Sequence, residues 1–360
     1  FLVLVCLVLI DFQHQMLVEN LLLPCLHNLV YLLIDLLEIP ALLNLKPLVN
    51  HSLYPIKRQP TDLDAKTSGT LTISSGILVG TSAELIAAYA AADAGTVSGL
   101  GSEALTVTGG ISVADFNALA AKTDQIITAT ITTTDATTLK TIAESGHNLT
   151  ITIADTVAAA ADISAIDALT AGQVTVSSGT ISGTNAELLA VNALKTAGTT
   201  ITAADVAKTI TDPVTAAQAN AIHALTTGLI TATISDTTTA LLDDLTGTGA
   251  NANAYTITTS ETTVTGANLI LVNDRTTLPV NASSITTLTG TAANILTCLV
   301  ENSDFDTDYT TAKARTITGL DAVAVTPTAG QTATIAQIFG IEKLTTGLVT
   351  ATVTAAGVNQ

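Results

Sequence analysis

The sequence contains no tryptophan, one methionine and only 3% aromatic residues in a chain of 360. Large globular cores are usually filled with bulky side chains, but here Thr, Ala, Val and Ile predominate. Such small side chains suit a thin core of the kind that stacked repeats bury between neighbours. The composition therefore disfavours the two or three globular domains that the length alone would suggest.

Basic residues are also scarce. The chain has 12 Lys and Arg against 30 Asp and Glu, which gives a formal net charge of −18. An acidic surface repels phosphate backbones, so we expect no nucleic-acid partner. The acidity is explained by solubility, with weak binding of divalent cations as the alternative.

Cysteines and long apolar runs are few. Cys6, Cys25 and Cys298 match neither a metal motif nor a disulfide framework, and so few cysteines are compatible with export. After residue 60 no apolar run approaches the roughly 18 residues that a membrane-spanning helix requires.

Residues 1–60 differ from the remainder, since they are rich in Leu and contain neither Thr nor Gly. We expect a helical segment here, with three alternative interpretations. It is a cap over the end of a repeat array, a leader or membrane-associating segment, or translated sequence outside the natural protein. Only the second interpretation predicts a membrane partner.

From residue 61 onward a T-x-T pair recurs, mostly at spacings of roughly 22 to 34 residues, as expected for a repeat architecture. In segments such as Ile127–Ile131 the apolar residues and the threonines alternate, which predicts a half-buried strand. Stacking such strands exposes a threonine ladder. The expected ladder residues are Thr128, Thr130, Thr150, Thr152, Thr175, Thr200, Thr202, Thr231 and Thr233.

Short helices are predicted between the strands. Thr81 with Glu84 and Thr184 with Glu187 have the spacing of capping boxes. Four acids are further expected N-caps, and two glycines are expected left-handed C-caps. Three asparagines are expected either to form a ladder between repeats or to be exposed polar positions at the helix ends. The expected N-caps are Asp115, Asp135, Asp205 and Asp236. The expected C-caps are Gly228 and Gly347, and the asparagines are Asn117, Asn192 and Asn220.

Strand–helix–strand units with parallel strands require crossovers, and these are right-handed. The sequence thus predicts an α/β repeat fold over residues 61–360. Its expected form is a right-handed β/α solenoid with parallel sheets, short helices and about ten irregular coils. The strand pattern at 348–354 further suggests that the array is a fragment of a longer one.

The repeating unit, T-[VI]-T-x-[DG] followed by x-x-A-x-x-[NL]-A-[LI]-x-x-x-T-T-G, resembles those of very large Thr/Ala-rich surface proteins of bacteria, notably marine cyanobacteria. The resemblance covers residues 66–360. It implies a secreted or surface-attached structural protein, and it implies no site residues.

Two candidate sites emerge from the residues. Asp304, Asp306 and Asp308 form a D-x-D-x-D cluster that suggests calcium, although the Gly and Glu of an EF-hand loop are missing. The threonine ladder suggests ice, but the irregular repeat length argues against a lattice match. His147 and His223 have no nucleophile or acid at motif spacing, so we expect no enzyme and no cofactor other than possible calcium.

We therefore expect an extracellular or cell-surface structural protein that associates with itself. The alternative is a binding module that uses the threonine face for ice or the acidic face for calcium or glycans.

Overall fold

The computed structural model describes residues 68–74, 76–246, 253–303, 314–328 and 333–352. The predicted helical segment at 1–60 and the D-x-D-x-D cluster lie outside these residues. The strands are β1 (Leu71–Thr72), β2 (Ile77–Gly80), β3 (Val97–Ser98), β4 (Ala104–Ile111), β5 (Ile127–Ile131), β6 (Asn148–Ile153), β7 (Val157–Ala159), β8 (Val174–Val176), β9 (Thr180–Gly183), β10 (Thr200–Thr202), β11 (Ala207–Ile210), β12 (Ile230–Asp236), β13 (Ala254–Thr259), β14 (Thr263–Thr265), β15 (Val280–Asn281), β16 (Thr287–Gly290), β17 (Ile317–Thr318) and β18 (Ala324–Pro327).

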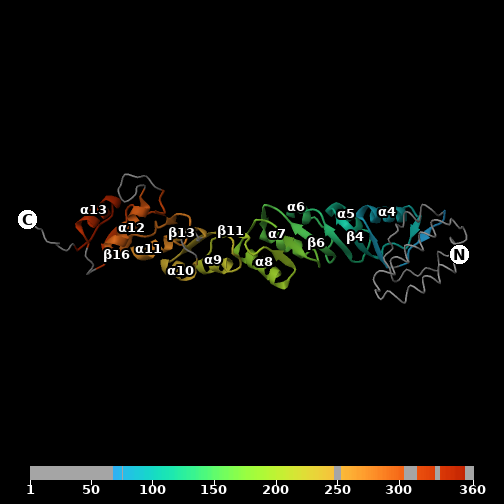
Figure 1. Ribbon diagram of the computed structural model, residues 1–360, viewed down its shortest axis with the longest axis horizontal. Coiled ribbons are helices and arrows are strands. Elements are labelled where there is room, and N and C mark those ends of the chain that lie inside the picture. The colour runs from blue at the N-terminus through green and yellow to red at the C-terminus, as the bar shows by residue number, and fades with distance from the viewer. Residues whose placement is uncertain (1–67, 75, 247–252, 304–313, 329–332, 353–360) are drawn as a thin grey trace, which may run out of the picture. The chain divides into compact units, whose positions relative to one another are not determined.

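The helices are short and lie between these strands (Figure 1). They are α4 (Ser82–Asp93), α5 (Val113–Ala120), α6 (Ala136–Leu139), α7 (Ala160–Asp167), α8 (Asn185–Ala197), α9 (Ala216–His223), α10 (Thr238–Asp244), α11 (Gly266–Asn273), α12 (Ala292–Asn302) and α13 (Ile335–Leu344). Helix α4 packs on α5, and each helix from α6 to α12 packs on the next. The protein is therefore an α/β protein with short helices, as predicted.

All strand pairs in the described residues are parallel. The strand orders of the sheets are β1-β3, β2-β4-β5-β6-β8-β10, β7-β9-β11-β12-β13-β15-β17 and β14-β16-β18. Most repeats therefore contribute two strands and a helix, with each strand pairing to its counterpart in the neighbouring repeat. The wide gap between T-x-T pairs before Thr316 is filled by β15 and β16.

Two repeats contribute one strand and change this pairing. Strands β5 and β12 both contain the sequence ITATI. On one side each pairs with the second strand of the preceding repeat, and on the other side with the first strand of the following repeat. At β5 the register passes from Thr106↔Thr128 to Gly110↔Thr130, so β4 contains two residues more than the strand opposite. We call the β5–α6 and β12–α10 segments the single-strand repeats.

The same register change occurs at β12. Thr209 pairs with Thr231 and Val214 bridges to Ile234, which again leaves two additional residues in the earlier repeat. The shared pentapeptide and the shared shift show that the single-strand repeat is a recurring element of the fold.

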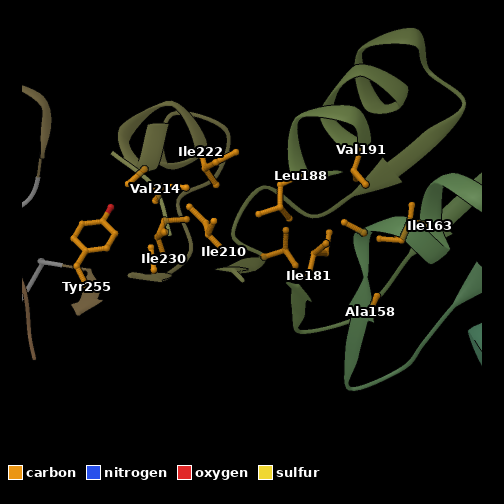
Figure 2. Packing of buried hydrophobic residues seen from close by; sticks show 14 of the residues in the cluster. Ala158, Ile163, Ile181, Leu188, Val191, Ile210, Val214, Ile222, Ile230 and Tyr255 are labelled. Atoms are coloured by element: carbon orange, nitrogen blue, oxygen red, sulfur yellow. The ribbon is translucent and has the colours of Figure 1, made fainter. Parts of the chain in front are cut away.

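Alternating apolar residues of the strands face the helices and form the core. Ile181 of β9 lies beneath Leu188 and Val191 of α8, and Ile230 and Ile222 repeat this arrangement further along the chain (Figure 2). The fully buried side chains are mostly Ile, Leu and Val, while Tyr255 and Phe116 are the largest of them. The buried aromatic residues of the described part are Tyr89, Phe116 and Tyr255, so small aliphatic side chains fill most of the core.

Candidate functional site

The predicted threonine ladder is divided between two sheets. Thr128, Thr130 and Thr150 are exposed on the sheet that contains β5, where Thr130 pairs with Thr150. Thr152 and Thr175 continue this sheet as a half-buried pair.

Thr231 and Thr233 are exposed on the sheet that contains β12. Thr231 pairs with Thr209 and Ala254, and Thr233 pairs with Thr256, so each has a threonine on one neighbouring strand. Because the predicted ladder residues belong to two sheets, they do not form one continuous face.

The prediction was wrong for Thr200 and Thr202, which are buried with 1% and 9% of their surface exposed. The register of β10 places them opposite Val174 and Val176, in the core column of β8. Ile201, 46% exposed, takes the outward position beside Thr175. The polarity of β10 is thus inverted, and the Thr200 hydroxyl is satisfied by donating to Asp167 Oδ1 at 2.8 Å.

A different set of threonines holds neighbouring repeats together. In the turn before β12, the buried Thr226 hydroxyl donates to the Ala204 and Val206 carbonyl oxygens at 3.0 and 2.6 Å. It also accepts from the Gly228 N–H at 3.0 Å. Both carbonyl groups belong to the preceding repeat, so one side chain joins two repeats.

We call this arrangement the threonine joint, and it recurs along the chain. Each joint has a threonine that accepts from the N–H two residues later and donates to a backbone carbonyl of the preceding repeat. The joint threonines are Thr123, Thr170, Thr226, Thr276 and Thr345.

Gly228 and Gly347 belong to these joints, and their predicted role as left-handed C-caps was wrong. Neither has a positive φ. A Cβ atom on Gly228 would lie 2.2 Å from the Asp205 carbonyl oxygen, and one on Gly347 would lie 2.1 Å from that of Val323. Glycine is required because the backbones of two repeats approach too closely for a side chain. By contrast, Gly198 does end α8 in the left-handed conformation, with φ 84°.

Several acids cap a helix of the preceding repeat. Asp155, Asp212, Asp236 and Glu261 accept from the N–H of the first residue of α6, α8, α9 and α10, respectively. A carboxylate at a helix N-terminus satisfies a free N–H and interacts favourably with the helix dipole. Part of the acidity is thereby explained as a structural feature of the repeat.

The predicted N-caps are partly confirmed. The capping boxes at Thr81 and Thr184 are present, and Asp135 caps α6. Ser112 caps α5 in place of Asp115, and Thr237 caps α10 in place of Asp236, which instead reaches the preceding helix. Asp205 is exposed in the turn between β10 and β11 and caps no helix.

We expect Glu261→Gln to lower the free energy of unfolding by about 1–2 kcal/mol, because Glu261 accepts from both the N–H and the hydroxyl of buried Thr238. Urea unfolding followed by circular dichroism measures the effect. The exposed residue Asp243 supplies the control Asp243→Asn, which should have little effect. Equal losses in both variants would contradict a capping role.

Asparagines add further bonds between repeats. Asn117 donates to the Thr141 carbonyl at 2.8 Å and accepts from the Ala143 N–H at 2.9 Å, and Asn220 accepts from the Thr246 hydroxyl at 3.1 Å. Both contacts join the repeat before a single-strand repeat to that repeat. These two asparagines do bond to the neighbouring repeat, but to backbone groups and a threonine and not to another asparagine. The half-buried Asn192 shows no such side-chain bond in the described residues.

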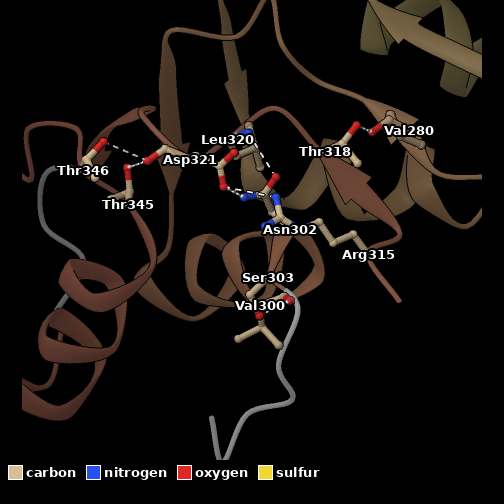
Figure 3. Close-up of polar contacts among 10 residues, drawn as sticks. All are labelled: Val280, Val300, Asn302, Ser303, Arg315, Thr318, Leu320, Asp321, Thr345 and Thr346. Atoms are coloured by element: carbon tan, nitrogen blue, oxygen red, sulfur yellow. Dashed lines mark hydrogen bonds and ion pairs between the residues drawn. The ribbon is translucent and has the colours of Figure 1, made fainter. Parts of the chain in front are cut away.

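The loop between β17 and β18 is held from two sides (Figure 3). Asn302, 1% exposed at the end of α12, accepts from the Leu320 N–H and donates to Asp321 Oδ1, both at 3.1 Å. The Asp321 carbonyl accepts from the hydroxyls of Thr345 and Thr346 in the next repeat. Polar groups in this loop thus serve contacts between repeats.

Hydrogen bonds from Thr138 lower the pKa of Asp135, whereas burial is the main cause of the other pKa shifts. Burial raises the pKa of Tyr255 to about 12 and that of the Cys298 thiol to about 12. Burial and the hydrogen bond to Glu103 raise the pKa of Tyr89 well above its usual range. The two tyrosines and the cysteine thiol remain protonated at neutral pH, so none is activated as a nucleophile or base.

Lys208 is a charged residue inside the core. It lies between Ile181 and Ile230 in adjacent strands and is 4% exposed. Burial, assisted by the positive charge of Lys195, lowers the pKa of its amine. This buried lysine could not be identified from the sequence, because the alternation of a strand predicts apolar side chains at the positions that face the core.

We expect Lys208→Met to stabilise the protein at pH 7 by about 1 kcal/mol, because burying a charged amine is unfavourable. The pKa of Lys208 is lower in the folded than in the unfolded state, so the unfolded chain binds more protons between the two values. Wild-type stability should therefore rise with pH through this window, and its difference from the variant should close as the pH approaches about 10.

Thermal unfolding at pH 7 to 10 provides the measurement. Lys195→Met is the control, since it removes only the neighbouring charge and should give a smaller gain. A loss of stability in Lys208→Met would show that the amine makes a favourable contact.

No metal centre is formed by the described residues, in which no three His, Cys, Asp or Glu side chains gather. The calcium prediction for Asp304, Asp306 and Asp308 concerns residues outside the described part and stays a prediction. No described helix has the length and apolar character needed to cross a membrane. A scan against protein-family models, a search of curated proteins and a search of solved structures each found no match.

Proposed function

We propose that this chain is a non-enzymatic structural protein, a segment of an extracellular or cell-surface filament, layer or adhesin-like assembly. In this proposal the α/β repeats wind into a right-handed solenoid of about ten irregular coils over residues 61–360. The right hand follows from the preference of parallel strand–helix–strand crossovers.

The observation that carries the proposal is the use of polar groups between repeats. The hydroxyl of Thr226, the carboxylate of Glu261 and the amide of Asn117 each bond to the neighbouring repeat. An enzyme gathers such polar side chains at one site, whereas here they recur along the array of repeats. Such a distribution favours a scaffold that extends by adding repeats.

Self-association is supported by exposed apolar side chains on α13. Ile335 and Phe339 lie one helical turn apart, and each is 61% exposed. Residues four apart on a helix are neighbours, so these two side chains form one exposed apolar patch, and such patches favour contact with another protein. We propose that a second copy of this chain packs here, as each helix of the array packs on the next.

Surface shaving of intact source cells tests the location. Brief protease treatment, followed by mass spectrometry of the released peptides, should yield repeat peptides from residues 61–360 before the cells lyse. Repeat peptides found only in the lysate would contradict a surface role.

The second candidate function is binding through the threonine face, favoured by the exposed pair Thr130 and Thr150. Ice binding would require thermal hysteresis, and Thr130→Leu should abolish it. Calcium binding would require a calcium-dependent rise in melting temperature, and glycan binding would require retention on a glycan array.

A further inference from the structure

His147 occupies the junction between the first single-strand repeat and the repeat that follows. Its Nδ1 atom accepts from the Ile127 N–H at 3.1 Å, at the start of β5. The residue is 6% exposed, and its ring packs edge-on against Phe116 of α5 at a centroid distance of 5.3 Å. An imidazole nitrogen accepts a hydrogen bond only when it carries no proton, so this contact requires neutral His147 with its proton on Nε2.

In the second single-strand repeat, an asparagine accepts the equivalent hydrogen bond. The Ile230 N–H at the start of β12 donates to Oδ1 of Asn253 at 2.8 Å, and Asn253 is 3% exposed. An amide oxygen accepts this bond at every physiological pH. The Nδ2 atom of the same amide lies 3.2 Å from Nδ1 of His223. His223 therefore contacts Asn253 and does not accept from the Ile230 N–H.

We propose that His147 makes the junction between β5 and β6 sensitive to acid, so that protonation opens it while the Asn253 junction retains its bond. A proton on Nδ1 would turn the acceptor into a donor that faces the Ile127 N–H. Both donors would then be buried without a partner, which is unfavourable.

The charged surroundings of His147 do not compensate fully. Glu144, on the same loop, places Oε2 3.7 Å from Nε2, but its side chain is 50% exposed and its attraction is screened by water. The other elements packed here offer Phe116 from α5 and Ile127 from β5, and Thr170 donates to the His147 carbonyl. Glu144 is the only carboxylate within ion-pair distance in the part of the chain that is described.

The equilibrium between the open and the closed junction depends on pH, because the two forms bind different numbers of protons. The open junction binds the proton and the closed junction excludes it, so closing becomes less favourable as the pH falls. The two forms differ by one proton, so over the pH range in which only the open form takes it up, each pH unit of acidification favours the open form by about tenfold.

Amide hydrogen exchange of the full chain at pH 7.5 and 5.5, corrected for the intrinsic rate, tests the proposal. We expect protection of peptides covering β5 and β6 to fall about tenfold in acid. In His147→Asn, which introduces the residue type found at Asn253, the same peptides should show no such fall. The same acid response in His147→Asn, or no response in the wild type, would overturn the proposal.

Glu144→Gln provides an independent test, because this partly exposed loop residue is replaced without disturbing the core. Removing the nearby carboxylate withdraws the attraction for the imidazolium, so protonation should open the junction more. We expect a larger acid response than in the wild type. A smaller response, or greater protection in acid than at pH 7.5, would show that the His147–Glu144 pair holds the junction closed, which is the opposite mechanism.

Discussion

Gly228→Ala is expected to lower the free energy of unfolding by about 3 kcal/mol, because the added methyl group would overlap the backbone of the preceding repeat. The new Cβ atom would lie 2.2 Å from the Asp205 carbonyl oxygen and 2.7 Å from the carbonyl group of Val206. Both obstacles are backbone atoms and cannot rotate away as a side chain does. The repeat containing α9 and the repeat containing α10 would have to move apart.

Gly179→Ala is the matched control. Gly179 lies in the turn between β8 and β9, and no atom lies within 4 Å of the Cβ position. The expected change is within about 0.5 kcal/mol, or a slight gain from a less flexible unfolded chain. Urea unfolding of both variants distinguishes close approach from a general need for glycine in turns. Equal losses would contradict the steric account.

Thr226→Val is expected to cost about 2–3 kcal/mol, although it preserves the shape and β-branching of the side chain. The hydroxyl donates to two carbonyl oxygens and accepts from one N–H at this joint. Valine would leave these buried groups without their partner. Because the joint links two repeats, hydrogen exchange in β11 and β12 should accelerate more than in distant strands.

Two further substitutions control this prediction. Thr226→Ser retains the hydroxyl and should recover most of the stability. Thr231→Val makes the same change at an exposed strand position and should have little effect. A Thr226→Ser variant as unstable as Thr226→Val would show that the methyl group, and not the hydroxyl, carries the effect.

The sequence allowed prediction of elements that depend on local chemistry. Alternation in Ile127–Ile131 predicts the exposure of every residue in β5, and the spacing of Thr184 and Glu187 predicts the start of α8. Both signals arise within one strand or one helix turn. The α/β class with parallel strands and short helices followed from them.

Features that depend on register between repeats could not be predicted in this way. Thr200 and Thr202 resemble an exposed T-x-T pair, but their pairing with Val174 and Val176 directs them inward. Gly228 resembles a helix C-cap because it follows a helix, yet its role depends on a carbonyl group 23 positions earlier in the chain. The two ITATI segments were a visible signal for the single-strand repeats, but only the register reveals the shift.

Sedimentation velocity of the full chain over a wide concentration range tests whether the protein is a structural array that associates with itself. We expect species that grow in steps with concentration, and negative-stain microscopy should show matching particles. In the double variant Ile335→Thr/Phe339→Ser, which removes the exposed apolar pair on α13, the same concentrations should give a single monomeric species. A wild-type chain that remains monomeric at every concentration, with and without calcium, would contradict self-association.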